Sequence, residues 1–202
     1  MWRSGEYFYT NSFLKELGYD NFITTRKAGD MKIPKLRNIV IGEQTHSTNF
    51  REVNYIPNLI KNNDGFITTK QGLWLGVFTA DCLPVYVVSN NSGFSSRPKV
   101  GALLHAGRLG VLNDIVGKCI DYFMGELDFK LRDIFVVVGP HISLFYYETD
   151  LQGLLASSLY KRGLLRDNLK LTNLCTFKQE DFFSYRADNQ TTSRMLSGLK
   201  IN

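Results

Sequence analysis

Short apolar runs alternate along this chain with stretches of helical periodicity, and this alternation constrains the fold more than any other feature. Runs rich in Val, Ile, Leu and Phe predict buried strands near residues 38–42, 73–78, 85–88, 100–104 and 133–138. Apolar residues recur with helical spacing over 111–124, and a second helix is predicted over 149–160, with Gly163 as its stop. Strands that alternate with helices predict a mixed α/β architecture, with an exposed, mobile polar loop at 89–97.

The length of the chain favours one domain. Its 202 residues are enough for a full hydrophobic core, whereas two separate domains would each be small. Hydrophobic residues make up 44% of the chain and charged residues 21%, which excludes wholesale disorder. We therefore expect a single domain over residues 1–202.

Charge and cysteine usage limit the partners and the compartment. The formal net charge of +5 is compatible with anionic ligands, but the basic clusters are short and lack the interleaved aromatic residues of a nucleic-acid platform. The N-terminus carries no apolar run of the secretory type, and no stretch approaches the roughly 20 apolar residues of a membrane span. Three widely spaced cysteines, Cys82, Cys119 and Cys175, fit a reducing compartment. We expect a cytoplasmic protein that binds neither nucleic acid nor membranes.

Three residues with borderline or soft ligand atoms follow, or interrupt, strong apolar runs: His46, Cys82 and His105. Zinc accepts imidazole nitrogen and thiolate sulfur, and a catalytic zinc site uses three protein ligands and one open position. The wide gaps between these residues match no local zinc motif, so spacing alone carries little weight. The residues by themselves make a shared metal site one hypothesis among several.

Other polar or reactive residues have ordinary structural explanations. Cys119 lies on the apolar stripe of the first helix, and Cys175 lies in an apolar segment, so both are expected to be packed thiols. His141 follows Gly-Pro and is more typical of a hydrogen-bonded turn. Asp81 could cap a turn, or serve as a partner of the neighbouring thiolate and as a proton acceptor. Arg186 could stack on a neighbouring aromatic ring or bind an oxygen pair of a phosphate or carboxylate.

An ordered series of motifs covers residues 44 to about 195, most of the chain. In order they are Gln44-Thr45-His46-Ser47, Asp64-Gly65-Phe66-Ile67-Thr68, Thr79-Ala80-Asp81-Cys82-Leu83-Pro84, Leu104-His105-Ala106-Gly107, Gly139-Pro140-His141-Ile142 with Tyr147-Glu148, and Phe182-Phe183-Ser184-Tyr185-Arg186. This series resembles the family labelled multicopper polyphenol oxidases or laccase-domain proteins, whose members are regarded as purine nucleoside-processing enzymes. Each motif is weak alone, but six in order are specific.

The resemblance implies a single YfiH-type domain with mixed β-sheets in α/β/β/α layers. It implies zinc ligation by His46, Cys82 and His105, with copper as the alternative ion. It also implies phosphate-dependent cleavage of adenosine, inosine or methylthioadenosine, with adenosine deamination as a second activity. The expected partners are therefore a purine nucleoside and phosphate, and the expected state is a monomer or homodimer.

Residue roles follow from this chemistry as hypotheses. Positively charged side chains must hold phosphate against the ribose C1′, and Arg26, Arg108 and Arg186 are the candidates. Tyr185 is expected to stack on the purine. For deamination, an acid/base residue must move a proton while water attacks the purine C6; Asp81 is the first candidate and His141 the second.

The chain departs from the family pattern at several positions that concern the substrate pocket. The family usually has Trp-Arg-Gly after His-Ala-Gly, where this chain has Arg108-Leu109-Gly110. The family's paired arginines appear as Arg186-Ala187. Residues 24–30 resemble the family's opening element, but the long segment that usually follows is mostly absent, so residues 1–37 form a shortened N-terminal segment.

Three other functions are compatible with the same residues. A cysteine hydrolase or deamidase would use Cys82 as thiolate and His105 as base, and the implied fold is shared with a bacterial toxin deamidase that works this way. The polyphenol oxidase (laccase) hypothesis is disfavoured, because one candidate cysteine ligand and three histidines are too few for the several coppers that oxygen reduction requires. A non-enzymatic reading makes the protein an assembly or editing partner in cell-wall (peptidoglycan) metabolism.

Overall fold

The computed structural model describes residues 1–28, 38–57, 60–90 and 97–202. Residues 29–37 of the expected N-terminal segment, and residues 91–96 of the loop expected at 89–97, lie outside these ranges. Within the described residues, no helix is long and apolar enough to cross a membrane.

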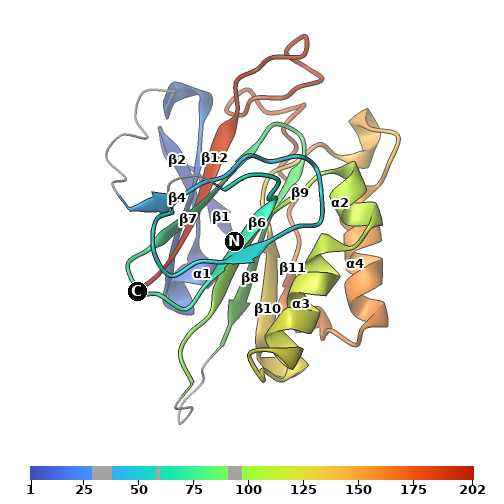
Figure 1. The fold of residues 1–202 in the computed structure, drawn as a ribbon. Helices are drawn as coiled ribbons and strands as arrows, with labels where there is room; N and C mark the ends of the chain where they lie inside the picture. The colour runs from blue at the N-terminus through green and yellow to red at the C-terminus, as the bar shows by residue number, and fades with distance from the viewer. Residues whose placement is uncertain (29–37, 58–59, 91–96) are drawn as a thin grey trace.

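Two six-stranded sheets form the centre of the molecule (Figure 1). In spatial order, the strands of the first sheet are β1 (Trp2–Arg3), β2 (Phe8–Asn11), β3 (Tyr19–Thr24), β12 (Met195–Ile201), β7 (Trp74–Thr79) and β4 (Ile39–Val40). Those of the second sheet are β11 (Leu169–Lys170), β10 (Ile134–Val138), β8 (Leu83–Ser89), β9 (Gly101–Ala106), β6 (Gly65–Thr68) and β5 (Arg51–Glu52). Both sheets mix parallel and antiparallel pairs, which confirms the predicted mixed architecture.

The helices lie mainly on one side of the second sheet (Figure 1). The α-helices are α1 (Ser12–Glu16), α2 (Arg108–Leu112), α3 (Ile115–Gly125) and α4 (Leu151–Lys161). Short 3-10 helices are η1 (Arg26–Ala28), η3 (Leu131–Asp133), η4 (Leu144–Tyr146) and η5 (Arg166–Asn168). α2, α3 and α4 cover the second sheet, whereas α1 joins β2 to β3.

The strand β8 shows why the central apolar runs are nearly continuous in sequence. Val85 and Val87 pack in the core formed with α3 and α4, while Tyr86 and Val88 pack in the core between the two sheets. Successive side chains of a strand point to opposite faces, so a strand covered on both sides needs apolar residues at nearly every position. All seven residues of β8 are buried.

The helical stripe predicted over 111–124 is divided in the structure. α2 ends at Leu112 and α3 begins at Ile115, with Asp114 between them in the left-handed region at φ 62°. The Asp114 side chain accepts a hydrogen bond from the Gly117 amide at 3.3 Å and caps α3. Leu112 is 53% exposed, so the expected continuous apolar face was wrong at this end. The second helix was predicted correctly, and Gly163 follows it with a positive φ of 90°.

Candidate metal centre and adjoining pocket

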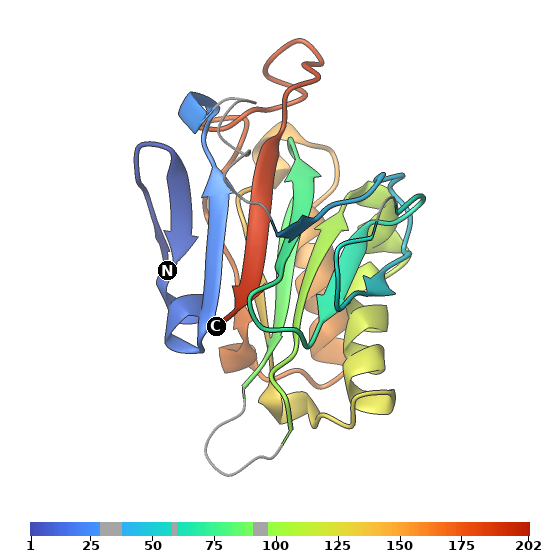
Figure 2. The same ribbon diagram turned by 60° about the vertical axis from the view of Figure 1, so that its left-hand side comes forward.

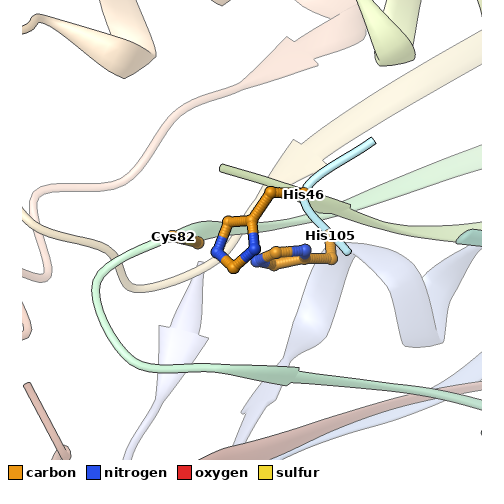
Figure 3. A group of neighbouring side chains, drawn as sticks. All are labelled: His46, Cys82 and His105. Atoms are coloured by element: carbon orange, nitrogen blue, oxygen red, sulfur yellow. The ribbon is translucent and has the colours of Figure 1, made fainter. Parts of the chain in front are cut away.

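His46, Cys82 and His105 converge on one point although they lie far apart in sequence (Figure 3). Their ligand atoms all lie within 4.8 Å of one another. The two imidazole rings have centroids 4.8 Å apart and are nearly perpendicular, at 80°. His105 is buried, Cys82 is partly buried and His46 is exposed, so the cluster opens toward solvent on one side.

Strand register brings Cys82 and His105 together. The antiparallel pair of β8 and β9 matches Leu83 with Ala106 and Pro84 with His105. Cys82 precedes β8, so it lies at the end of the sheet where β9 finishes. His46 comes from a separate loop and has a positive φ of 58°. Local sequence spacing therefore could not have placed these three residues together.

Asp64 contacts both the loop that carries His46 and the side chain of His105, and it was not among the site residues predicted from the sequence. Its fully buried carboxylate accepts hydrogen bonds from the amides of His46 at 3.1 Å and Ser47 at 2.7 Å, and from the Ser47 hydroxyl at 2.7 Å. The same carboxylate lies 2.7 Å from Nδ1 of His105. An ionised carboxylate only accepts, so Nδ1 donates to Asp64, and Nε2 is the ring nitrogen that can bind a metal once its proton is displaced. In the sequence, the Asp64-Gly65 pair was identified only as part of one motif in the ordered series.

Gly107 allows the histidine loop to approach the cysteine. A Cβ atom at this position would lie 2.8 Å from Cδ2 of His46 and 3.2 Å from Sγ of Cys82. Both distances are shorter than an ordinary van der Waals contact, so a larger residue would displace the candidate ligands. The glycine of the His-Ala-Gly motif is therefore explained by close packing against the cluster.

The charged forms of Cys82, His105 and Asp64 stabilise one another. Burial raises the pKa of the Cys82 thiol, but hydrogen bonds and charge from His105 and His46 outweigh it and lower the pKa to about 6. Burial lowers the pKa of His105, but Asp64 and Cys82 outweigh it and raise the pKa to about 9. Burial also raises the pKa of Asp64, yet its hydrogen bonds to His105 and Ser47 hold it well below its usual range. Cys82 is therefore a thiolate at neutral pH, the form that binds metals and acts as a nucleophile.

The cluster lies in the wall of a pocket of about 1110 Å³. One group of lining residues is aromatic: Phe78, Tyr146, Tyr147, Phe177 and Tyr185. A second group carries guanidinium groups: Arg108, Arg186 and Arg194. Tyr146 and Phe177 are stacked, with ring centroids 4.4 Å apart and planes 14° from parallel. The pocket thus combines flat apolar surfaces with positive charge beside the three candidate ligands.

The three pocket arginines are held differently. Arg186 pairs with Glu148 at 3.0 Å, and its guanidinium lies 4.4 Å from the centre of the Tyr147 ring. Arg194 donates to the carbonyl groups of Thr191 at 2.6 Å and Ser193 at 2.9 Å. Arg108 begins α2 and is exposed. Among the described residues, neither Arg108 nor Arg194 forms an ion pair with a carboxylate, so both leave positive charge in the pocket.

A family model described as multi-copper polyphenol oxidoreductase laccase matches residues 23–150 and 145–202 of this chain. The chain belongs to this family. Two similar relatives are named purine nucleoside phosphorylase. The one from Corynebacterium glutamicum is 32% identical over 180 residues, which cover 76% of this chain and 70% of the relative. The one from Clostridium acetobutylicum is 31% identical over 180 residues, which cover 77% and 73%.

Solved structures of low sequence identity share the laccase-family fold. YlmD from Geobacillus stearothermophilus superimposes with a TM-score of 0.88 at 20% identity, over 99% of this chain and 98% of that one. A Bacillus licheniformis hypothetical protein, YfiH, has a TM-score of 0.88 at 19% identity, over 100% and 99%. The YfiH-type fold expected from the motifs is confirmed.

Two residues that the sequence assigned to the site of this laccase-family chain do not line the pocket. Arg26 forms a two-oxygen pair with Asp188, at 2.7 and 2.5 Å, and lies over the Phe183 ring. His141 is 4% exposed, and its Nδ1 is 3.1 Å from the Gly139 carbonyl oxygen. Burial lowers the pKa of His141. Tyr185 and Asp81 do line the pocket, as does Arg194, which was not among the site residues predicted from the sequence.

Proposed function

We propose that this chain is a zinc-dependent purine nucleoside phosphorylase, with adenosine deamination as a second activity. The observation that carries the proposal is the His46, Cys82 and His105 cluster in the wall of a pocket lined by aromatic rings and guanidinium groups. The names of the corynebacterial and clostridial relatives support the phosphorylase activity. Adenosine, inosine and methylthioadenosine are the substrates we propose.

The donor set fits zinc. Two imidazoles and one thiolate are ligands that zinc accepts, and three protein ligands leave one position open toward the pocket. Asp64 orients His105 from behind, as partners of metal-binding histidines commonly do. The same donors also suit copper, which is the alternative ion. Bound zinc would supply Lewis acidity, which stabilises negative charge and lowers the pKa of water.

The remaining roles belong to the pocket residues. We propose that Arg108 and Arg186 bind phosphate, because both guanidinium groups line the pocket and suit paired phosphate oxygens. Tyr185 offers a half-exposed ring on which a purine can stack. In phosphorolysis, these contacts hold phosphate near the ribose C1′ while the C1′–N9 bond breaks. Proton transfer by His141 and phosphate binding by Arg26 stay predictions, and the role of Asp81 is argued in the next subsection.

The cysteine hydrolase or deamidase is the second candidate, favoured by one observation. The Cys82 thiol interacts with both histidines, and its pKa is lowered to about 6, as in nucleophilic cysteines. A metal-bound thiolate is a poor nucleophile, so the two functions exclude each other at this residue. Metal-free protein that is active, and that loses activity when Cys82 is alkylated, would favour the hydrolase.

The purified zinc-loaded protein should be incubated with adenosine, with and without inorganic phosphate. We expect adenine and ribose 1-phosphate only when phosphate is present, and inosine in either condition. With phosphate, inosine tested alone should release hypoxanthine and ribose 1-phosphate. Methylthioadenosine tested alone should release adenine and methylthioribose 1-phosphate. If adenosine yields neither adenine nor inosine, the nucleoside function is wrong.

A further inference from the structure

Asp81 precedes the candidate ligand Cys82 and has an unusual backbone. Its φ is 85°, in the left-handed region that Asp and Asn tolerate better than most residues other than glycine. The residue is 7% exposed although it carries a carboxylate. A buried acid in such a conformation needs partners that stabilise it.

Asp81 connects three segments that are distant in sequence. Oδ1 accepts a hydrogen bond from the Thr176 hydroxyl at 2.7 Å, and Oδ2 accepts one from the Arg186 amide at 2.9 Å. The backbone carbonyl of Asp81 accepts a third, from the Ile142 amide at 3.0 Å. The side chain therefore holds its partners with both oxygens.

Each of the three segments contributes to the pocket. Ile142 and Arg186 line it directly, and Phe177 lines it next to Thr176. Tyr185 precedes Arg186 and also lines the pocket. The arginine and aromatic walls are therefore tied through Asp81 to the turn that carries Cys82.

We infer that Asp81 is a positioning residue, which fixes Arg186 and its neighbours relative to the metal centre and does not itself exchange protons with substrate. This inference rests on the proposed phosphorylase function for its kinetic effects, but the positioning itself can be measured without catalysis. Both carboxylate oxygens are engaged in hydrogen bonds to the protein, and one of those donors is a backbone amide that cannot reverse its direction.

Two substitutions separate positioning from proton transfer. Asp81→Asn keeps an oxygen for the Arg186 amide and can donate its NH₂ to the Thr176 hydroxyl, which also accepts hydrogen bonds. Asp81→Gly suits the positive φ but removes both contacts. A positioning residue should thus be rescued by Asn, whereas a proton acceptor should be lost equally in both variants. Asp167→Asn, an exposed site outside the pocket lining, is the matched control for loss of a carboxylate.

We expect Asp81→Gly to raise the KM for phosphate at least about tenfold, while Asp81→Asn stays within about threefold of the unchanged protein. Arg186→Ala should raise this KM similarly, and Asp81→Gly combined with Arg186→Ala should be no worse than either alone. Equal loss of kcat in the Asn and Gly variants, with KM unchanged, would overturn the inference in favour of proton transfer. Loss of zinc from both variants would overturn it in favour of a role in the metal centre.

Hydrogen exchange provides the readout that does not depend on activity. In the zinc-loaded protein, the Arg186 amide should exchange at least about tenfold faster in Asp81→Gly than in Asp81→Asn or the control. Faster exchange in a protein that cleaves no nucleoside would refute the proposed function and keep the positioning role. Unchanged exchange in Asp81→Gly would refute the positioning role. If Asp81→Gly does not fold, the activity of Asp81→Asn decides: near-normal activity supports positioning, and a hundredfold loss overturns it.

Discussion

Cys82 supplies the sulfur in a cluster whose other two ligand atoms are imidazole nitrogens, so its removal is the most direct test at the scale of single residues. Cys82→Ala leaves His46 and His105, and two ligands bind zinc far more weakly than three. We expect purified Cys82→Ala to contain less than about a tenth of the zinc in the unchanged protein, by mass spectrometry of metal content. Cys119→Ala, deep in the helix-side core, is the control cysteine. Equal metal in Cys82→Ala would contradict the proposed ligand set.

Asp64 should matter for the metal although it is not a proposed ligand. In Asp64→Asn, the side-chain NH₂ would face the amide and hydroxyl of Ser47, which donate to a carboxylate oxygen in the unchanged protein, so the loop that carries His46 loses hydrogen bonds. His105 also loses its negatively charged partner. We expect the zinc affinity to fall about 10- to 100-fold, measured by competition with a chromophoric chelator. Asp167→Asn should keep normal affinity. An unchanged affinity in Asp64→Asn would show that the buried carboxylate does not orient the ligands.

At this scale the sequence singled out the three clustered candidate ligands, but not the residue that supports them. His46, Cys82 and His105 belong to recognisable motifs, and the strand register places two of them side by side. The environment of Asp64 could not be predicted, because its partners come from separate segments. Arg26 shows the opposite problem: its motif suggested phosphate binding, but its partner Asp188 is 162 residues away.

Among the elements, the break between α2 and α3 is the clearest departure from the sequence pattern. The apolar periodicity continues across residues 111–124, but Asp114 turns the chain after α2 and caps the N-terminus of α3. Its carboxylate also accepts from Ser158 at 2.9 Å and pairs with Arg162, so it connects α3 to α4. Periodicity alone could not reveal a break whose cause includes partners on another helix.

Asp114→Ala should therefore destabilise the helical layer. The variant loses the cap of α3, and alanine tolerates a positive φ less well than aspartate. We expect the free energy of unfolding to fall by about 1–2 kcal/mol in urea titrations followed by circular dichroism. Asp114→Asn keeps a capping oxygen and suits the same φ, so it should lose less. Equal loss in the two variants would indicate that the ion pair with Arg162 dominates.

Across the whole molecule, the pair of Arg26 and Asp188 joins the N-terminal part of the chain to the segment before β12. Burial raises the pKa of Asp188, but the hydrogen bonds from Arg26 and Ser184 outweigh it and lower the pKa. The pKa of an Asp in the unfolded chain is about 3.9, and at pH values above this the charged Asp188 stabilises the folded state. This contribution is lost as the pH falls through the lower pKa that Asp188 has in the folded protein.

The pH dependence of one variant tests this link. Asp188→Asn should be less stable than the unchanged protein at pH 7, and the difference should stay constant down to about pH 5. Below about pH 4 the difference should shrink, because the unchanged protein also loses the charge. Thermal unfolding at several pH values measures it, with Asp167→Asn as control. A difference that grows at low pH would have the wrong sign for this mechanism.

The position of β12 has a consequence for synthesis. This strand lies between β3 and β7, both of which precede it by more than 100 residues (Figure 2). While residues 195–201 are still inside the ribosome, β3 and β7 cannot be bridged, and each leaves a row of peptide groups unpaired. The second sheet needs no residue beyond 170 and can assemble earlier. A nascent chain that stalls before Met195 therefore has an incomplete first sheet, in which the edges of β3 and β7 that pair with β12 are open to aggregation. Such a chain should depend on chaperones more than the full-length chain does.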